Sequence, residues 1–571
     1  MMAETIEGDF YRRQVKAMWK MPIGIDDFEK IRTKDFYFVD KTDFIRQLID
    51  SSREVTLITR PRRFGKTLTM SMLECFFSIE KETQSRHLFD GLSIERAGAA
   101  YMAQRGQYPV LFLSLKDFSC RSWPDMLEMW AEYLQSCFLQ HTQLRNQEKV
   151  QPELIENFQD IVTKKANKAA LANALALLVR MMRQYYGRKV IVLIDEYDAP
   201  IQQAWECGFY DKMIAFMRQF LGSVLKGNDN LDFAVLTGVL HVAKESIFSG
   251  LNNLKVCSVL DENYADVFGF TAADVARMAV DLQHEGELPE IQDWYDGYRF
   301  GGQKIYNPWS VINFFDQGRS GDYWINTSGN SILHQLLSSR SPQQEKDLYA
   351  LLKGQSVSAV IRESLVYEDL KKYKDALCSM LVTTGYLTVI EKKQMPGGPY
   401  CRLQIPNKEI RDAYQFEVLQ HMSDTLAVSD LYAMLEALLG GDAEIFSDDL
   451  QRYLAQFVSA YDAANKESFY HGLLLGLTAL VLNDYTVESN RESGYGRFDL
   501  AIFPKETDRA GVIMEFKVAA NEGEMEEKAK EALQQIEDRE YVTEFQKRGV
   551  KEVWKYGIAF CGKKIVVHRS S

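Results

Sequence analysis

The stretch from Val55 to Thr69, VTLITRPRRFGKTLT, constrains the fold of this chain more than any other. A short apolar run ends at Thr59, and the triplet Gly65-Lys66-Thr67 then opens an amphipathic segment. This order predicts strand, tight loop and helix, the context in which such a triplet indicates a phosphate-binding loop. Helix N–H groups, the Lys66 charge and the Thr67 hydroxyl suit nucleotide phosphates and a magnesium ion. The predicted cofactor-binding loop comprises Arg60, Pro61, Arg62, Arg63, Phe64, Gly65, Lys66, Thr67 and Leu68.

One position departs from the usual pattern of these loops, G-x-x-x-x-G-K-[ST]. The first glycine falls at Arg60, so the loop must bend without the residue that adopts positive φ most readily. Arg60, Arg62 and Arg63 could offset this loss by placing positive charge beside the phosphates. The alternative is an ordinary basic turn between a strand and a helix, which the triplet alone does not exclude.

A second apolar stretch, KVIVLIDEYDAP from Lys189 to Pro200, ends in paired carboxylates. An apolar run this short fits a buried parallel strand, and its C-terminal tip lies where open α/β sheets bind ligands. We predict that Asp195 and Thr67 hold the metal and that Glu196 orients the attacking water. The alternative, Asp195 as a helix N-cap, is disfavoured by the accompanying phosphate loop.

Strands alternate with helices over the first 270 residues. Besides the two strands already described, we expect strands over residues 108–115 and 233–237, with helices at 123–140, 169–186 and 209–225. This alternation predicts a parallel, doubly wound sheet. Thr237, at the tip of the last strand, occupies the place of a polar sensor for the γ-phosphate. A solvated loop explains the polar residues that follow it equally well.

From about residue 271 the sequence changes to helical segments with polar turns. The segment 294–315 combines aromatic residues, a Gly-Gly turn and a proline helix start, and MPGGP at 395–399 predicts a hairpin turn. These features indicate a helical or winged middle module. A length of 571 residues fits three or four domains. We place them at residues 1–270, 271–425 and 426–571.

The composition argues against several classes of protein. A net charge of -13 disfavours a globally basic nucleic-acid coat, although local patches stay open. The eight cysteines show no C-x-x-C pair and no zinc spacing, which is typical of reduced intracellular thiols. The N-terminus lacks an apolar signal core, and the longest apolar run, 472–482, is too short to cross a bilayer. We expect a cytoplasmic protein without membrane association.

A second group of chemically active side chains lies near the C-terminus. Asp499 begins one apolar strand, and a second strand, GVIMEFKV, carries Glu515 and Lys517 on one face because they are two residues apart. The pattern D…E-x-K occurs in phosphodiesterases whose carboxylates bind Mg²⁺ while the lysine orients water or stabilises developing charge. We predict that Asp499, Glu515 and Lys517 are catalytic and that Asp499 and Glu515 bind metal. Glu467, on a preceding apolar helix, is an additional candidate ligand.

Basic residues dominate the segment from residue 547 to the C-terminus. A local excess of positive charge in an acidic protein suits a phosphate backbone. Solvated lysines on a terminal hairpin explain the same pattern equally well.

The chain as a whole resembles bacterial AAA-ATPase-like proteins with a C-terminal PD-(D/E)XK nuclease domain. The resemblance is carried by MPIGIDDFEKIRTKDFYFVDKT, ITRPRRFGKT, VLIDEYDAPI, LTGVLHVAKESIFSGLNNL, WYDGYRF, YNPWS, FYHGLLLGL, SGYGRFDL and MEFKV. An arginine at the first glycine position of the loop is usual in this family. His241 departs from it, since relatives have arginine there.

This resemblance implies an α/β fold: a P-loop NTPase, a winged-helix-like middle region and a restriction-endonuclease-like C-terminal domain. It implies ATP binding and hydrolysis coupled to a Mg²⁺-dependent nuclease acting on DNA. The alternative is a switch-type signalling or scaffold ATPase whose nuclease-like domain only binds nucleic acid or a protein partner. A homo-oligomer stays open.

Overall fold

The structure is a computed structural model that describes residues 19–241, 247–248, 251–324, 347–348, 350–364, 374–423, 428–457, 470, 474, 477–482, 484–489, 492–493 and 496–570. The chain divides into two compact units, which are described separately. The first comprises Met1–Ser328 and Ser356–Ile410, and the second comprises Gly329–Gln355 and Arg411–Ser571. No helix within the described ranges is long and apolar enough to cross a membrane.

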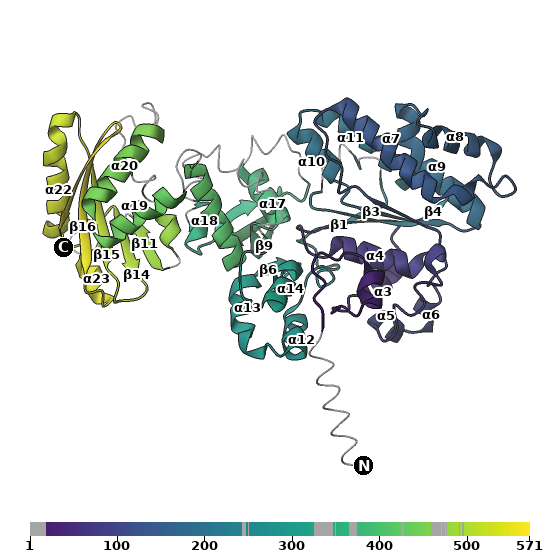
Figure 1. Ribbon diagram of the computed structural model, residues 1–571, viewed down its shortest axis with the longest axis horizontal. Coiled ribbons are helices and arrows are strands. Elements are labelled where there is room, and N and C mark those ends of the chain that lie inside the picture. The colour runs from purple at the N-terminus through teal and green to yellow at the C-terminus, as the bar shows by residue number, and fades with distance from the viewer. Residues whose placement is uncertain are drawn as a thin grey trace, which may run out of the picture. The chain divides into compact units, whose positions relative to one another are not determined.

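The first unit is built on a five-stranded parallel sheet in the order β2-β3-β4-β1-β5 (Figure 1). Its strands are β1 (Val55–Thr59), β2 (Val110–Ser114), β3 (Val190–Asp195), β4 (Leu231–Gly238) and β5 (Leu254–Cys257). Every residue of β1 and β3 is buried, because helices cover both faces of the sheet. The predicted α/β class with a parallel, doubly wound sheet is therefore confirmed.

Two groups of helices cover this sheet, and Figure 1 shows one on each face. On one face lie α7 (Trp123–Gln140), α8 (Pro152–Val162), α9 (Lys168–Tyr186), α10 (Ala199–Glu206) and α11 (Tyr210–Leu225). On the other lie α3 (Asp43–Ser51), α4 (Lys66–Phe77), α5 (Ser93–Arg96) and α6 (Ala99–Met102), with the short α2 (Phe28–Thr33) packed on α4. Phenylalanines dominate the core beneath α4, including Phe28, Phe44, Phe76 and Phe89.

The parallel register brings the important strand ends together at one edge of the sheet. β4 lies between β1 and β3, and Ile58 of β1 pairs with Thr237. On the other side of β3, Ser114 pairs with Asp195. The C-terminal ends of β1, β3 and β4 therefore meet at the edge where open parallel sheets bind ligands.

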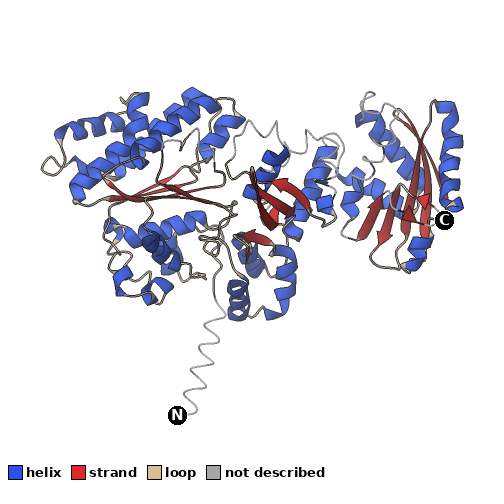
Figure 2. Ribbon diagram, turned by 180° about the vertical axis from the view of Figure 1, so that it is seen from behind, coloured by secondary structure: helices blue, strands red, loops and turns tan. Residues whose placement is uncertain are grey.

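The remainder of the first unit combines short helices with two small antiparallel sheets (Figure 2). Its elements are α12 (Ala272–Leu282), α13 (Leu288–Tyr295), β6 (Tyr298–Phe300), β7 (Gln303–Ile305), α14 (Pro308–Gln317), β8 (Val357–Val360), α17 (Lys374–Thr384), β9 (Thr388–Met395) and β10 (Gly398–Gln404). Thr271 and Asp274 form a capping box at the start of α12, where the sequence changes character. The predicted hairpin turn joins β9 to β10.

The second unit has a five-stranded sheet in the order β11-β14-β15-β16-β17, in which only the β15–β16 pair is parallel. Its strands are β11 (Tyr485–Ser489), β14 (Leu500–Pro504), β15 (Gly511–Val518), β16 (Val553–Cys561) and β17 (Lys564–Ser570); β12 (Glu492–Ser493) and β13 (Gly496–Arg497) form a separate pair. The helices of this region are α18 (Lys408–Ser423), which begins in the first unit, α19 (Val428–Gly440), α20 (Ala443–Phe457), α22 (Met525–Asp538) and α23 (Thr543–Lys547).

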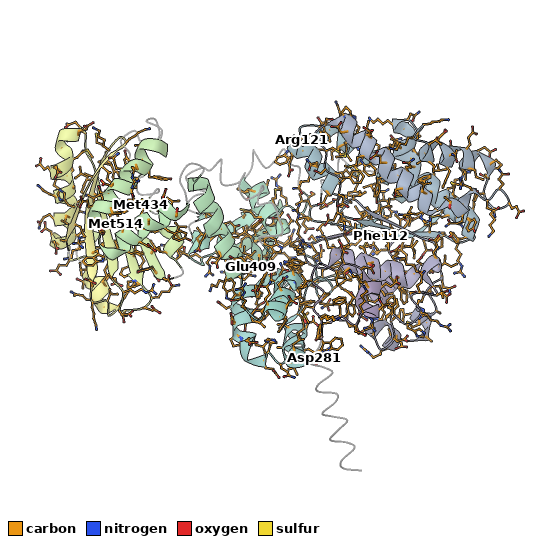
Figure 3. All side chains as sticks on the ribbon, viewed as in Figure 1. Phe112, Arg121, Asp281, Glu409, Met434 and Met514 are labelled. Atoms are coloured by element: carbon orange, nitrogen blue, oxygen red, sulfur yellow. The ribbon has the colours of Figure 1, made fainter. Side chains whose placement is uncertain are left out.

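Two apolar layers cover the two faces of this second sheet. On one face Met434 of α19 belongs to the same core as Met514 of β15, and Figure 3 labels both side chains. On the other face Ala529 and Ile536 of α22 pack against the sheet. The predicted C-terminal α/β domain is thus confirmed.

Candidate nucleotide and nuclease sites

The loop between β1 and α4 bends at two positions with positive φ. Arg63 has φ 67° and Gly65 has φ 80°, whereas Arg60, at the position of the absent glycine, is not among the positive-φ residues. Gly65 precedes the first turn of α4, which begins at Lys66. The chain therefore turns at Arg63, three residues later than the glycine pattern suggests. The positive φ of Arg63 is a strained backbone conformation for a residue other than glycine.

The Arg60 side chain binds backbone carbonyls, whereas it was expected to place positive charge beside the phosphates. Its guanidinium is fully buried and donates to the carbonyls of Thr59 (2.8 Å), Cys257 (2.9 Å), Tyr264 (3.2 Å) and Asn263 (3.5 Å). Burial lowers the pKa of Arg60 to about 10, so the side chain stays charged at neutral pH. Through these hydrogen bonds Arg60 joins the end of β1 to the end of β5 and the chain that follows it.

Residues 62–68 of the predicted loop line a cavity of about 740 Å³, whereas Pro61 does not. Arg62 and Arg63 are exposed at its wall, followed by Phe64, Gly65, Lys66, Thr67 and Leu68. Tyr37, Phe38 and Val39 form an apolar part of the wall, while Lys116 and Asp117 follow the end of β2. The cavity therefore joins a basic, N–H-rich loop to an aromatic and aliphatic wall, as a nucleotide requires.

Lys66 lies against the phosphate loop at the start of α4. Its Nζ donates to the carbonyls of Pro61 (2.8 Å) and Arg60 (3.1 Å), and only 4% of the residue is exposed. Burial lowers the pKa of Lys66, an effect that the nearby carboxylates of Glu196 and Asp195 oppose. The ammonium therefore sits within the loop that the sequence assigns to the phosphates.

Asp195 connects the phosphate loop to the central strand. Its Oδ2 accepts a hydrogen bond from the Thr67 hydroxyl (2.6 Å), and its Oδ1 accepts one from the Thr237 hydroxyl. Both Asp195 and Thr237 are fully buried, so they do not line the cavity directly; Thr67 does. This cluster holds a carboxylate and a hydroxyl side by side, which is the donor set that a hard divalent cation prefers.

Glu196 lines the cavity from the turn that follows β3. Its backbone has φ 51°, a conformation that costs a residue other than glycine roughly 1–2 kcal/mol. The neighbouring segment must hold this turn in place. The predicted role of Glu196 at the attacking water stays a prediction.

Residues beyond the sheet enclose the phosphate loop from outside. The Arg63 guanidinium lies 4.3 Å from the Trp309 ring centroid, and the Trp324 indole donates to the Arg62 carbonyl (3.1 Å). Phe64 packs against the rings of Tyr298 and Phe300. Sequence patterns did not identify these contacts, since they join segments more than 200 residues apart.

The second unit brings together Asp499, Glu515 and Lys517. Asp499 Oδ2 accepts a hydrogen bond from the amide of Phe516 (2.8 Å), which places it beside β15. Lys517 Nζ lies 3.4 Å from Glu515 Oε1, and the Gln535 amide donates to the same oxygen. The Gln535 side chain, on α22, therefore also holds Glu515 in place.

Glu515 carries a buried carboxylate oxygen that the described residues leave unsatisfied. It is 3% exposed, and within the described part of the chain its Oε2 has no hydrogen-bond partner. Burial, reinforced by the charge of Asp499, raises the pKa of Glu515 to about 7. A buried carboxylate oxygen without a donor is costly unless a cation or a water satisfies it. The described residues contain no group of three potential metal ligands, and Glu467 lies outside them.

The basic C-terminal segment is partly neutralised by acidic neighbours. Arg548 pairs with Glu488 (2.8 Å) and also contacts Glu544, while Lys555 pairs with Glu537 (2.7 Å). The Lys564 ammonium also forms an ion pair with Glu522. These pairs favour the interpretation of an ordinary charged surface over that of a dedicated phosphate-binding patch.

Two regions of the chain match families of known proteins. Residues 22–248 match a family described as predicted AAA-ATPase, and residues 465–570 match the PD-(D/E)XK nuclease superfamily. The chain is also similar to an uncharacterized protein in the vnfD 5′ region of Azotobacter chroococcum mcd 1, with 29% identity over 549 residues. That alignment covers 93% of this chain and 94% of the relative. Trp309 and Trp324, which contact the phosphate loop, lie beyond the first matched region.

Proposed function

Because the chain joins an AAA-ATPase-like domain to a domain of the PD-(D/E)XK nuclease superfamily, we propose that it is an ATP-regulated, metal-dependent nuclease that acts on DNA. The observation that carries the proposal is that each domain gathers its expected polar side chains at one place. Thr67 meets Asp195 beside the cavity, and Lys517 meets Glu515 beside Asp499.

In the first domain the cavity binds ATP with its phosphates along the loop. Lys66 and the exposed Arg62 and Arg63 supply positive charge, and the N-terminus of α4 supplies backbone donors. Thr67 and Asp195 hold the magnesium ion of the nucleotide. Glu196, which lines the cavity, orients the attacking water.

In the second domain Asp499 and Glu515 bind the metal, since Glu515 offers a buried oxygen that no described residue satisfies with a donor. A bound magnesium ion supplies charge stabilisation at the phosphate and lowers the pKa of a water. Lys517 holds a positive charge beside the same carboxylate and stabilises charge that develops on the phosphate. Gln535 keeps Glu515 in position.

The test is a cleavage assay on single- and double-stranded DNA with Mg²⁺. We expect Asp499→Ala and Lys517→Ala to lower the cleavage rate by about 100-fold or more, the usual effect of losing a charge-stabilising group. Lys528→Ala, which removes a partly exposed lysine of α22 paired with Glu531, is the matched control and should cut at the wild-type rate. Cleavage by Asp499→Ala at the wild-type rate overturns the assignment.

One observation favours a second function, a switch-type ATPase whose nuclease-like domain only binds nucleic acid or a partner protein. The described residues contain no group of three potential metal ligands. Wild-type protein that binds DNA without cleaving it, while it still binds ATP, supports this alternative. Metal-dependent cleavage that Asp499→Ala abolishes excludes it.

A further inference from the structure

Asp198 occupies the N-cap position of α10, but its side chain makes no capping hydrogen bond to that helix. Its Oδ2 instead accepts hydrogen bonds from the amides of Leu240 (2.7 Å) and Val239 (2.9 Å), just beyond the end of β4. The residue is 6% exposed. The Asp198 carboxylate therefore binds two amides that are distant in sequence. It joins the turn after β3 to the chain after β4.

Tyr197 strengthens the same connection. Its amide donates to the Thr237 carbonyl (3.0 Å), and its hydroxyl donates to the Leu240 carbonyl (2.7 Å). Gly238 permits the close approach, because a Cβ there would lie 2.6 Å from Asp198 Oδ1 and 2.8 Å from the Tyr197 ring. Hydrogen bonds and close packing thus hold residues 197–198 against residues 237–240.

This connection lies between Glu196 and Thr237, whose relative positions matter for the proposed hydrolysis. Glu196, with its strained positive φ, directly precedes Tyr197, and Thr237 donates to Asp195 at the other side of the connection. Strained backbone persists only where its surroundings hold it. Through its hydrogen bonds with the amides of Val239 and Leu240, Asp198 holds the turn after β3 against the end of β4.

We propose that Asp198, assisted by Tyr197, is a positioning residue that keeps Glu196 and Thr237 in register for ATP hydrolysis. This inference rests on the proposed ATPase activity. Its action depends on an oxygen that accepts two amides, and an asparagine carbonyl oxygen can do the same. Asp198→Asn is therefore the conservative variant, whereas Asp198→Leu retains the approximate size and loses both acceptors.

The experiment measures kcat for phosphate release, Kd for ATP and hydrogen exchange of residues 237–241 in the full chain. We expect Asp198→Leu to lower kcat by about 100-fold, because small displacements of reacting groups have effects of this size. Its Kd should change by less than about threefold, since the loss falls on the reaction rather than on binding. Exchange at Val239 and Leu240 should become faster. Asp198→Asn should restore slow exchange and most of kcat, and Asp232→Asn, at the other end of β4, is the control.

A wild-type kcat in Asp198→Leu overturns the inference. If Asp198→Asn lowers kcat as much as Asp198→Leu does, the negative charge is what matters, and the inference is also overturned. If Asp198→Leu does not fold, Tyr197→Phe decides: a lower kcat with faster exchange supports the connection, and an unchanged kcat refutes it. Wild-type protein without ATP turnover refutes the proposed hydrolysis itself, and the inference falls with it. The two failures are therefore distinguishable.

Discussion

Replacing Arg60 tests whether this arginine stabilises the fold, in contrast to Arg62 and Arg63, which line the cavity. In Arg60→Ala the carbonyls of Thr59, Cys257 and Tyr264 lose a donor that lies within 3.2 Å. Each buried carbonyl without a donor costs about 1–3 kcal/mol. Water entering the vacated space recovers part of this, so we expect a net loss of about 3–5 kcal/mol, near the upper end for single substitutions.

Calorimetry of the full chain measures this loss. The transition that moves upward on adding ATP reports the first unit, since a ligand stabilises the domain that binds it. At about 2 °C per kcal/mol for a domain of this size, Arg60→Ala should lower that Tm by about 6–10 °C. Arg60→Lys, whose single ammonium cannot reach all the carbonyls, should give an intermediate loss.

Arg62→Ala is the matched control for this experiment. Arg62 is exposed at the cavity wall, so its removal should change stability by no more than about 0.5 kcal/mol. It should weaken ATP binding instead. A Tm of Arg60→Ala within about 1 °C of wild type, a shift corresponding to less than about 1 kcal/mol, refutes the carbonyl-binding role.

Two further predictions concern charge. Lys66→Ala should weaken ATP binding by about 1.5–3 kcal/mol, the value of a charge-assisted hydrogen bond, and an unchanged Kd in a titration with fluorescent ATP counts against the phosphate loop. Burial raises the pKa of Glu409, labelled in Figure 3, from 4.5 to about 8, so the folded state binds this proton more tightly than the unfolded state does. Its stabilising contribution is then complete below about pH 4.5 and is lost as the pH rises through about 8. Glu409→Gln should flatten the pH dependence of Tm across this window, and parallel profiles for the two proteins contradict the assignment.

The edge of the first sheet follows directly from local sequence patterns. The buried strands and the polar residues at their tips, Asp195 and Thr237, could be predicted because parallel strands all end at the same edge. β5 could not, since three of its four residues are only partly buried and its sequence, LKVC, lacks a continuous apolar run. Strand β5 and the chain after it supply three of the four carbonyls that bind Arg60, so the direction of that side chain could not be predicted either.

The contacts that enclose the phosphate loop could not be predicted from the sequence either, because they join residues that are distant along the chain. The proline start of α14 could be predicted from the sequence, but it carries no information that Trp309 stacks on Arg63. In the second unit the spacing of Glu515 and Lys517 predicts a shared face, and their ion pair at 3.4 Å agrees. The contact of Gln535 with Glu515 depends on how α22 packs on β15, which no local pattern determines.

The most direct test of the central claim, that nucleotide state regulates cleavage, is the rate of DNA cleavage with and without ATP in wild type and in Lys66→Ala. Free Mg²⁺ is held constant, because ATP itself binds the metal. We expect ATP to change the wild-type rate and to leave Lys66→Ala unchanged, while the two proteins cut equally without nucleotide. An equal response to ATP in both proteins, or no cleavage under any condition, contradicts the account.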